Sequence, residues 1–466
     1  MSEYYLPFVF AGRDGCCRRA NIKSHAEVQK EEAMDAKKKK LIVFSADAMV
    51  TEDLEYMKTL PNYQKYLAKG CIVERVKTIY PTITYPCHTS MCTGVYPNKH
   101  GILGNIQFIP GLKKGPWKWF LEWRKPEVED IFTAAKRHGL TTAAVFWPVT
   151  GNHPDIDYLI DEYWLQYPGD DFVEAFRRSG SSEEVLEVVE KFREGTTIRE
   201  HPSTDYFIVD CTCELIKRFQ PDLIMIHPAN IDSYRHKYGL FNDKVTEGIE
   251  ETDRWIGQIM EAVEEAGLLD VTNFVLTSDH GQMDIKRVVN PNVFLADAGL
   301  IKVENGRVVD WDAWFLSGGF SGLVYLKDPT NKEIYDKTYA LLKHMVSEGI
   351  YGMGQVFTEA EINEKEHLGG DFAFAVESDG FSSFGEDWMR PIVTNFDVED
   401  YRYGRATHGY LPDKGPQPIF VAAGPDFNEG VVIDRRPIVD EAPTYAALLG
   451  FDLPGADGKP IKEFIR

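Results

Sequence analysis

The sequence has few cysteines, no long apolar run and none of the commonest catalytic signatures. Its seven cysteines among 466 residues follow no regular spacing, which is typical of reduced thiols and argues against a disulfide framework. No apolar run is long enough to cross a lipid bilayer, and the N-terminus starts acidic and lacks a cleavage region, so we expect a cytoplasmic protein with no membrane segment and no signal peptide. The absence of a Walker A motif, an HExxH motif and a complete serine-hydrolase elbow argues against the classes that those motifs mark.

The sequence is also short of positive charge. Lys and Arg number 51 against 73 Asp and Glu, so the net charge is −22. Such a field repels a nucleic-acid backbone, and we expect no nucleic acid polymer as a partner. A small anionic substrate is still compatible, provided that its site is locally positive. The hydrophobic share of 43% is typical of a globular protein, and the sequence carries no signal for its oligomeric state.

Short apolar runs that end in Gly, Pro, Asp or His indicate strands buried on both faces. Helical patterns separate these runs, such as 127–139 and 247–267, each of which ends at a glycine. Strands that alternate with helices predict an α/β fold, with a mostly parallel central sheet and helices on both faces. The five apolar runs are 40–47, 141–147, 222–228, 273–281 and 417–425.

The pattern divides the chain into three predicted parts. Residues 1–39 show no periodicity, and we expect them to form an N-terminal arm. Residues 290–400 are loosely patterned and richer in Gly, aromatic residues and acidic clusters, which indicates an inserted cap subdomain. The α/β core is then formed by residues 40–289 and 401–466.

Carboxylate and imidazole side chains gather where the predicted strands begin or end. Taken singly, an Asp after a strand is more often a helix N-cap or a turn residue. As a set, these side chains share one edge of the sheet, where they would repel one another without cations. Mixed oxygen and nitrogen ligation suits zinc, with manganese or iron as alternatives. The set comprises Asp47, Asp232, His236, Asp279, His280 and His408.

The stretch TIYPTITYPCHTSMCTG, from Thr78 to Gly94, contains a candidate nucleophile. Pro86 fits the first turn of a helix that runs to about Cys92 and closes at Gly94. Thr84 is then just ahead of a helix N-terminus, where the helix dipole favours negative charge. Direct coordination to a dication would make its hydroxyl a usable nucleophile, and the alternative is a plain N-cap.

Five motifs follow one another through most of residues 40–450. They are FSAD, PTITYPCH with TGVYPNKHGILGN, DSYRHKYG, TSDHGQMDI and HGYLPDKGPQPIFVAAGPDF. In order and spacing they resemble the alkaline phosphatase superfamily, and most closely its nucleotide pyrophosphatase/phosphodiesterase branch. The resemblance implies a hydrolase with two Zn2+ ions and a phospho-threonine intermediate formed on Thr84. It also implies the ligands of each ion, which are Asp47, Thr84, Asp279 and His280 for the first, and Asp232, His236 and His408 for the second.

One position departs from that branch. The branch usually has Asn three residues after the threonine, where its amide donates to a phosphate oxygen, whereas this chain has Cys87, a weak donor. The candidates for replacing the donor are Asn105, the backbone N–H groups at the helix start and Cys87 itself. Tyr85 occupies the position where the branch stacks a nucleobase on an aromatic ring. Nearby aromatic residues either extend this surface or pack the loop: Trp117, Trp119, Phe120 and Trp123.

We therefore predict a metal-dependent hydrolase that cleaves phosphodiester or pyrophosphate bonds of a small-molecule phosphate ester. A phosphonate substrate is the alternative, because phosphonoacetate hydrolases share the metal layout. A phosphomonoesterase or a phosphomutase fits less well. The mutases carry a large insertion after the nucleophile, whereas the irregular segment here lies between His280 and His408. A non-catalytic binding protein is expected to have lost a ligand or the nucleophile, and none is missing.

Overall fold

The computed structural model describes residues 38–111, 119–120, 122, 129–162, 171–198 and 200–466. Its internal contacts divide the chain into two units, Met1–Lys38 and Lys39–Arg466, and the fold reported below is that of the second unit. The predicted N-terminal arm, residues 1–39, lies almost wholly outside the described residues. The predicted division of the remaining chain into a core and a cap stays a prediction.

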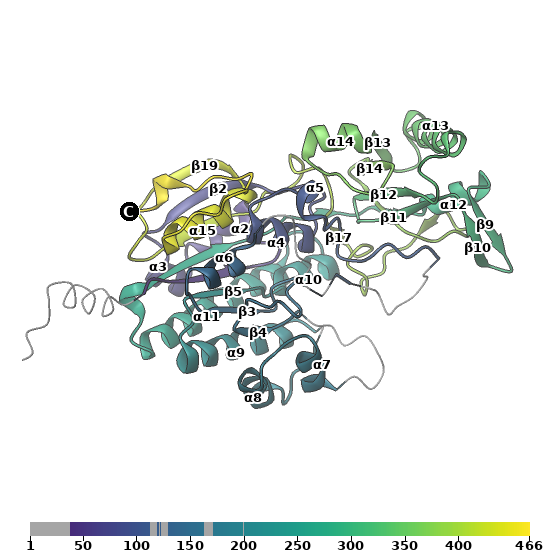
Figure 1. Cartoon of the computed structure of the whole chain (residues 1–466). Coiled ribbons are helices and arrows are strands. Elements are labelled where there is room, and N and C mark those ends of the chain that lie inside the picture. Colours follow the sequence, from purple (N-terminus) through teal and green to yellow (C-terminus); the bar gives the residue numbers. More distant parts are fainter. Residues whose placement is uncertain (1–37, 112–118, 121, 123–128, 163–170, 199) are drawn as a thin grey trace, which may run out of the picture. The chain divides into compact units, whose positions relative to one another are not determined.

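An eight-stranded central sheet forms the core of this unit (Figure 1). The strand β18 runs antiparallel to its two neighbours, and the other neighbouring pairs are parallel. This arrangement confirms the predicted α/β fold with a mostly parallel sheet. The strands lie in the order β19 (Val432–Pro437), β2 (Cys71–Lys77), β18 (Phe420–Ala423), β6 (Thr272–Thr277), β1 (Lys40–Ser45), β5 (Leu223–Ile226), β3 (Thr142–Val145) and β4 (Tyr158–Ile160).

Each face of the sheet has its own hydrophobic core, because successive strand residues point to opposite faces. Ile42 and Phe44 pack into one core, whereas Leu41 and Val43 pack into the other. The first core includes residues of α2 (Thr51–Met57), α3 (Pro61–Tyr66), α7 (Phe172–Arg178), α8 (Glu183–Phe192), α9 (Ser203–Phe219), α10 (Asn230–Tyr238) and α11 (Asp243–Glu265). The second includes residues of α4 (Thr84–Thr93), α6 (Ile131–Arg137) and α15 (Glu441–Leu449). Helices therefore cover both faces, as predicted.

Two predicted helices begin directly after a capping residue, and these start points differ from the ones that their apolar pattern predicted. The helix α6 begins at Ile131, because the Asp130 side chain accepts a backbone N–H of its first turn at 2.8 Å. The helix α11 begins at Asp243, because the Asn242 side chain accepts two backbone N–H groups there. The sequence pattern therefore placed the first boundary too early and the second too late.

Residues 290–400 contain regular structure that the sequence pattern did not reveal. A four-stranded antiparallel sheet in the order β11-β12-β14-β13 packs with α13 (Lys332–Glu348) around a separate hydrophobic core. Its strands are β11 (Ala313–Ser317), β12 (Ser321–Leu326), β13 (Met353–Thr358) and β14 (Phe374–Ser378). The neighbouring elements are α12 (Pro291–Asp297), β9 (Ile301–Glu304), β10 (Arg307–Trp311), α14 (Glu359–Glu366), and a three-stranded sheet of β8 (Arg287–Val289), β15 (Ser382–Phe384) and β16 (Val393–Thr394).

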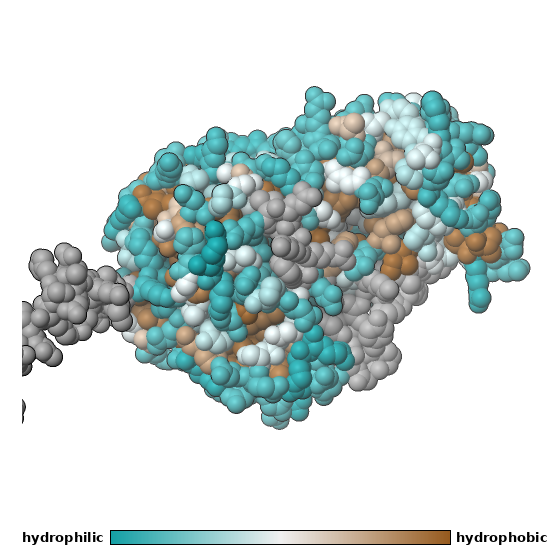
Figure 2. Space-filling view, viewed as in Figure 1, coloured by the Kyte–Doolittle hydropathy of each residue, from teal (hydrophilic) through white to brown (hydrophobic). Residues whose placement is uncertain are grey.

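The face of the molecule drawn in Figure 2 is mostly polar. In the view of Figure 2, hydrophilic residues dominate and apolar residues form only small separate patches. Among the residues that the structure describes, no helix combines the length and the apolar character that crossing a membrane requires.

Candidate active site

The first predicted metal cluster forms where β1 and β6 end. In these parallel neighbours Ser45 is paired with Thr277. Asp47 and Asp279 each lie two residues beyond this pair, so both lie at the same edge of the sheet. His280 Nε2 lies 3.2 Å from Asp279 Oδ2 and 3.6 Å from Asp47 Oδ1. The ligand atoms of Asp47, Asp279 and His280 all lie within 4.8 Å of one another, and the three side chains are at most 3% exposed.

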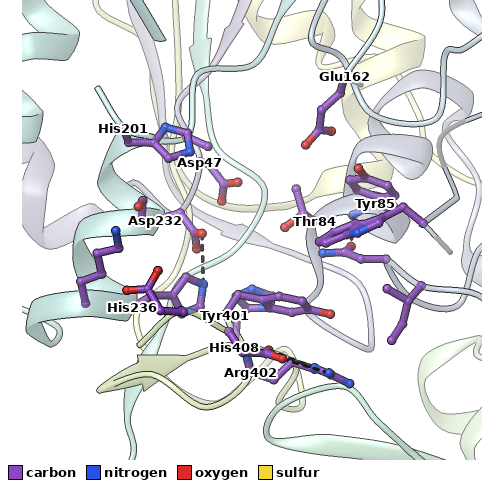
Figure 3. Close-up of a pocket in the computed structure, with 18 of the residues that line it drawn as sticks. Asp47, Thr84, Tyr85, Glu162, His201, Asp232, His236, Tyr401, Arg402 and His408 are labelled. Atoms are coloured by element: carbon purple, nitrogen blue, oxygen red, sulfur yellow. Dashed lines mark hydrogen bonds and ion pairs between the residues drawn. The ribbon is translucent and has the colours of Figure 1, made fainter. Parts of the chain in front are cut away.

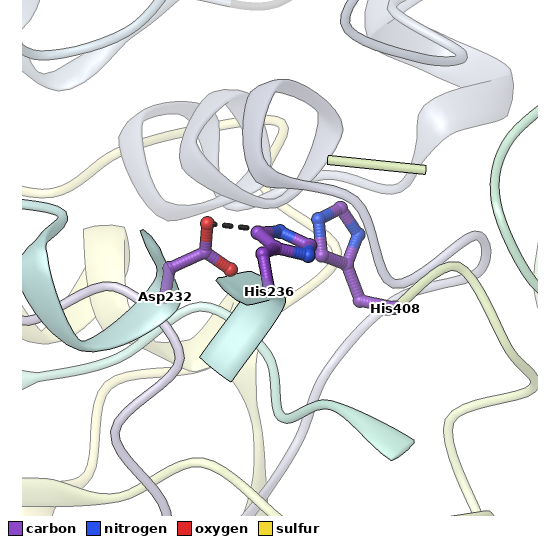
Figure 4. A group of neighbouring side chains, drawn as sticks. All are labelled: Asp232, His236 and His408. Carbon is purple, nitrogen blue, oxygen red and sulfur yellow. Dashed lines mark ion pairs between the residues drawn. The ribbon is translucent and has the colours of Figure 1, made fainter. Parts of the chain in front are cut away.

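The second predicted cluster joins α10 to the short strand β17 (Ala406–Thr407). Asp232 and His236 are one helical turn apart on α10, and Asp232 Oδ2 lies 3.1 Å from His236 Nε2. His408 follows β17, which pairs with β7 (Met283–Asp284) just after the first cluster. The three side chains also bring one ligand atom each within 4.8 Å of the others (Figure 4).

Hydrogen bonds hold the imidazoles of the second cluster in a ligand-ready state. His236 Nδ1–H donates to the Ala406 carbonyl at 2.8 Å, and His408 Nδ1–H donates to the Thr82 carbonyl at 3.0 Å. Because a carbonyl oxygen can only accept, these bonds fix Nδ1 as the donor, and Nε2 is the nitrogen of each ring that is available to a metal ion. Burial lowers the pKa of His408 to about 3, so this ring is neutral at pH 7.

The buried ligand atoms of both clusters fit metal ions. Asp47 Oδ1, Asp279 Oδ2 and His236 Nε2 are buried and have no hydrogen-bond partner among the described residues. Burial raises the pKa of Asp279 well above its ordinary value, and the nearby Asp47 raises it further. Burying two such carboxylates side by side is costly unless cations neutralise them. Asp/His sets of this composition suit Zn2+, Mn2+ or iron.

The candidate nucleophile lies beside the first cluster. Thr84 Oγ1 is 3.2 Å from His280 Nε2, and the side chain is 6% exposed. Thr84 is the first residue of α4 and Ile83 is its N-cap, so Thr84 is not the plain N-cap that we considered as the alternative. The helix ends at Gly94, whose φ of 70° is in the left-handed region, and this closure is the predicted one.

Two further histidines support the first cluster and the nucleophile. His227 Nε2–H donates to Asp47 Oδ2 at 2.9 Å, which leaves Oδ1 directed at the cluster. His88 Nδ1–H donates to the Thr84 carbonyl at 2.8 Å, and its Nε2 accepts the Ser45 hydroxyl at 2.9 Å. The two imidazole rings lie 4.2 Å apart, centroid to centroid. They therefore link the Asp47 carboxylate to the helix that carries Thr84.

Thr84, the three residues of the second cluster and, from the first cluster, Asp47 line one cavity of about 230 Å³ (Figure 3). Tyr85 and Asn105 line this cavity as predicted candidates for substrate contacts. Asn105 Oδ1 accepts the Tyr85 N–H at 2.9 Å, so the NH2 end of its amide is the part available to a ligand. The Tyr85 ring lies 5.6 Å from that of Trp119, which also lines the cavity.

Cys87 is not among the residues that line the cavity, and its contact with substrate stays a prediction. Its thiol is fully buried and lies 3.2 Å from the Thr78 hydroxyl, which itself donates to the Asp279 carbonyl. Cys87 comes three residues after Thr84 on α4, which places it about 60° around the helix and about 4.5 Å further along its axis. Its thiol packs among the residues of the second hydrophobic core.

Two of the four predicted aromatic residues lie in the described part of the chain, and further residues line the cavity. Trp119 and Phe120 pack near Tyr85, whereas Trp117 and Trp123 lie outside the described residues. Several residues that line the cavity were not predicted, because they lie outside the motifs or, within DSYRHKYG, beside the predicted ligands: Glu162, His201, His227, Ser233, Lys237, Glu399, Asp400, Tyr401 and Arg402. Of these, His227 had a detectable signal, since it ends the apolar run of β5 at the same sheet edge.

The fold, the two Asp/His clusters and the adjacent threonine are those of the metal-dependent hydrolase class that the sequence resembles. The chain belongs to the type I phosphodiesterase/nucleotide pyrophosphatase family, whose model matches residues 41–411.

Known relatives are similar over part of their length. Human ectonucleotide pyrophosphatase/phosphodiesterase family member 1 is 28% identical over 273 residues, which is 57% of this chain and 26% of that protein. Venom phosphodiesterase 2 of Crotalus adamanteus is 24% identical over 404 residues, which is 84% of this chain and 42% of that protein. The chain thus spans less than half the length of these relatives.

Solved structures share the fold. Murine ectonucleotide pyrophosphatase/phosphodiesterase 5, an inactive variant in complex with AMP, has a TM-score of 0.62 at 19% identity and covers 92% of this chain and 100% of its own. The human counterpart also has a TM-score of 0.62, at 18% identity, with 90% and 97% of the two chains covered.

Proposed function

We propose that this protein is a two-zinc hydrolase that cleaves phosphodiester or pyrophosphate bonds of small nucleotides through a phospho-threonine intermediate. The observation that carries the proposal is the position of Thr84 Oγ1, 3.2 Å from a ligand atom of one cluster, in the cavity that the other cluster also lines. Manganese or iron would suit the same ligands. Family membership supports the bond type, and the AMP bound to the murine relative supports a nucleotide.

With two bound dications, the proposed ligand sets give the site a small net positive charge. Asp47, Asp279 and His280 would hold one ion, with Thr84 beside it, and Asp232, His236 and His408 would hold the other. When bound, two dications supply a centre that stabilises negative charge on the attacking and leaving oxygens. Four positive charges against the three carboxylates leave about one positive charge, so an anionic phosphate is attracted locally.

The proposed reaction transfers the phosphoryl group to Thr84 and then to water. The Thr84 oxygen forms a bond to phosphorus as its proton is released to solvent. The bond from phosphorus to the leaving oxygen breaks, and this oxygen departs with the electron pair. Water then attacks phosphorus, the bond to Thr84 breaks, and the threonine hydroxyl is regenerated. The Asn105 amide, one of the three predicted candidates for this role, donates to a non-bridging oxygen of the phosphoryl group.

A substrate panel tests this proposal. The zinc-loaded protein is assayed with bis-p-nitrophenyl phosphate, p-nitrophenyl phosphate, a nucleoside triphosphate and phosphonoacetate. We expect the diester or the triphosphate to be cleaved fastest, and EDTA to abolish the activity. Rapid cleavage of the monoester with an untouched diester would contradict the diesterase assignment. Cleavage of phosphonoacetate alone would replace it with carbon–phosphorus bond hydrolysis.

A further inference from the structure

The side-chain amide of Gln282 donates two hydrogen bonds to a predicted ligand of the second cluster. Gln282 follows His280 by two residues, is fully buried and is not among the residues that line the cavity. Its Nε2 group donates to the backbone carbonyl of Asp232 at 3.1 Å and also to Asp232 Oδ1. One amide group therefore fixes both the main chain and the side chain of Asp232.

The orientation of this amide follows from its partners. Carbonyl and carboxylate oxygens only accept hydrogen bonds, so the NH2 end of Gln282 must face Asp232. The amide oxygen Oε1 is then buried, and it has no hydrogen-bond partner among the described residues. A buried acceptor without a partner lowers stability, and an apolar side chain of the same length would avoid this cost. The bonds to Asp232 therefore explain a glutamine at this position better than the stability of the fold does.

The hydrogen bond from Gln282 gives the two Asp232 oxygens different roles. Oδ1 accepts the amide N–H, whereas Oδ2 lies 3.1 Å from His236 Nε2, within the second cluster (Figure 4). The two imidazoles of this cluster are held by the carbonyls of Ala406 and Thr82. Gln282 gives the carboxylate the corresponding support, since the ligands of a metal ion are oriented by hydrogen bonds to their other atoms.

The backbone around Gln282 is fixed in place on both sides. A Cβ atom added at Gly281 would lie 2.3 Å from the carbonyl oxygen of Pro416, so the chain fits closely against its neighbour there. Met283 begins β7 and pairs with Thr407 of β17, the residue just before the third ligand of the second cluster. The amide therefore extends from a backbone whose position is well defined relative to that cluster.

We infer that Gln282 is a positioning residue for the second metal ion, which holds Asp232 with Oδ2 directed at the ion and Oδ1 kept out of its coordination. This inference rests on the proposed function, in which Asp232, His236 and His408 hold that ion. Gln282 acts only through Asp232. Because it follows His280 by two residues, it also joins a ligand of the second ion to the segment that supplies ligands of the first.

A zinc titration of the full chain tests the inference. Gln282→Met removes the amide and keeps the length of the side chain. In competition with a chromophoric chelator, wild type should bind two Zn2+ ions, and Gln282→Met should bind one of them about 10- to 100-fold more weakly. The other ion should keep its affinity. In Asp232→Ala, which lacks a ligand of the second ion, adding Gln282→Met should leave the affinity of the remaining ion unchanged.

The matched control is Gln417→Met. The Gln417 amide donates to the backbone carbonyls of Pro412 and Gly415 at 3.0 and 3.1 Å, and its Oε1 is also buried without a partner in the described part of the chain. It supports no predicted metal ligand, so Gln417→Met should leave both zinc affinities unchanged. In the Co2+-substituted protein, the visible absorption bands of the second ion should change in Gln282→Met and not in the control. The reason is that a released Asp232 carboxylate can bind through both oxygens and raise the coordination number.

Unchanged zinc affinities in Gln282→Met, with two ions bound, would overturn the inference, as would an equal weakening of both ions. A urea midpoint of the metal-free protein that falls far more than in Gln417→Met, with both zinc affinities intact, would also overturn it by showing a purely structural role. A wild-type protein that binds fewer than two Zn2+ ions would contradict the proposed function itself. If Gln282→Met does not fold, Gln282→Asn, whose amide is one methylene shorter, is titrated in its place, and unchanged affinities there count against the inference.

Discussion

Replacing His227 by leucine should weaken metal binding at the first cluster without unfolding the protein. The His227 N–H donates to Asp47 Oδ2 at 2.9 Å, and the two side chains are only 2% and 3% exposed. Loss of such a supporting hydrogen bond typically costs 10- to 100-fold in metal affinity, or about 1.4–2.7 kcal/mol. The range agrees with about 1.5–3 kcal/mol for a hydrogen bond to a charged group.

The assay is a competition between the protein and a chromophoric chelator for Zn2+, combined with thermal unfolding of the metal-free protein. His227→Gln retains an N–H donor and should recover part of the lost affinity. His344→Leu changes a histidine that is 61% exposed on α13 and serves as the control. A folded His227→Leu protein whose zinc affinity is within about twofold of wild type would refute the reasoning.

The remaining predictions concern the nucleophile, the phosphate donor and one buried acid. Thr84→Ala should abolish hydrolysis while both clusters still bind metal, as turnover and metal content will show. Asn105→Ala should lower kcat by about 100- to 1,000-fold, or about 2.7–4 kcal/mol. Cys87→Ala should instead lower the free energy of unfolding by about 1–2 kcal/mol, because its thiol fills the core. Burial raises the pKa of Glu441 from 4.5 to about 8, so the unfolded chain releases this proton at lower pH than the folded protein. Glu441 should therefore cost about 1.4 kcal/mol of stability for each pH unit between these values, and Glu441→Gln should gain in urea midpoint over wild type as the pH rises from about 5 to 7.5.

Each of these predictions has a contradicting result. Turnover by Thr84→Ala would exclude this threonine as the nucleophile. A larger loss of kcat in Cys87→Ala than in Asn105→Ala would indicate that the cysteine, and not the asparagine, donates to the phosphate oxygen. A urea midpoint difference that does not change with pH would show that Glu441 is ionised in the folded protein at neutral pH, and that the hydrogen bonds from Thr277 and Tyr445, which lower its pKa, outweigh the effect of its burial.

The predicted clusters could be found from the sequence because parallel strands end at one edge of a sheet. The pairing of Ser45 with Thr277 is enough to bring Asp47 and Asp279 together. His408 is the harder case, since its position depends on the short pairing of β17 with β7. It was predicted as a candidate ligand from its place just before a strand, and the resemblance implied which ligands share an ion. The convergence of the ligand atoms agrees with those assignments, whereas the zinc, its number and the role of each ligand remain predictions.

Other features have no signal in a single sequence. The antiparallel sheet within residues 290–400 was hidden, because short strands separated by glycine-rich turns resemble irregular chain. Lys237 and Ser233 looked like ordinary surface residues of α10 until the cavity was known. The spacing of Cys87 along its helix does not specify which neighbour its side chain meets. The predicted cytoplasmic location rests on the sequence alone.

The most direct test of the account is an anomalous X-ray diffraction map at the zinc edge from crystals of the zinc-loaded protein. We expect two peaks roughly 3.5–4 Å apart, one among Asp47, Asp279 and His280 and the other among Asp232, His236 and His408, with the Thr84 oxygen beside the first. A single peak, or peaks outside these two clusters, would contradict the account.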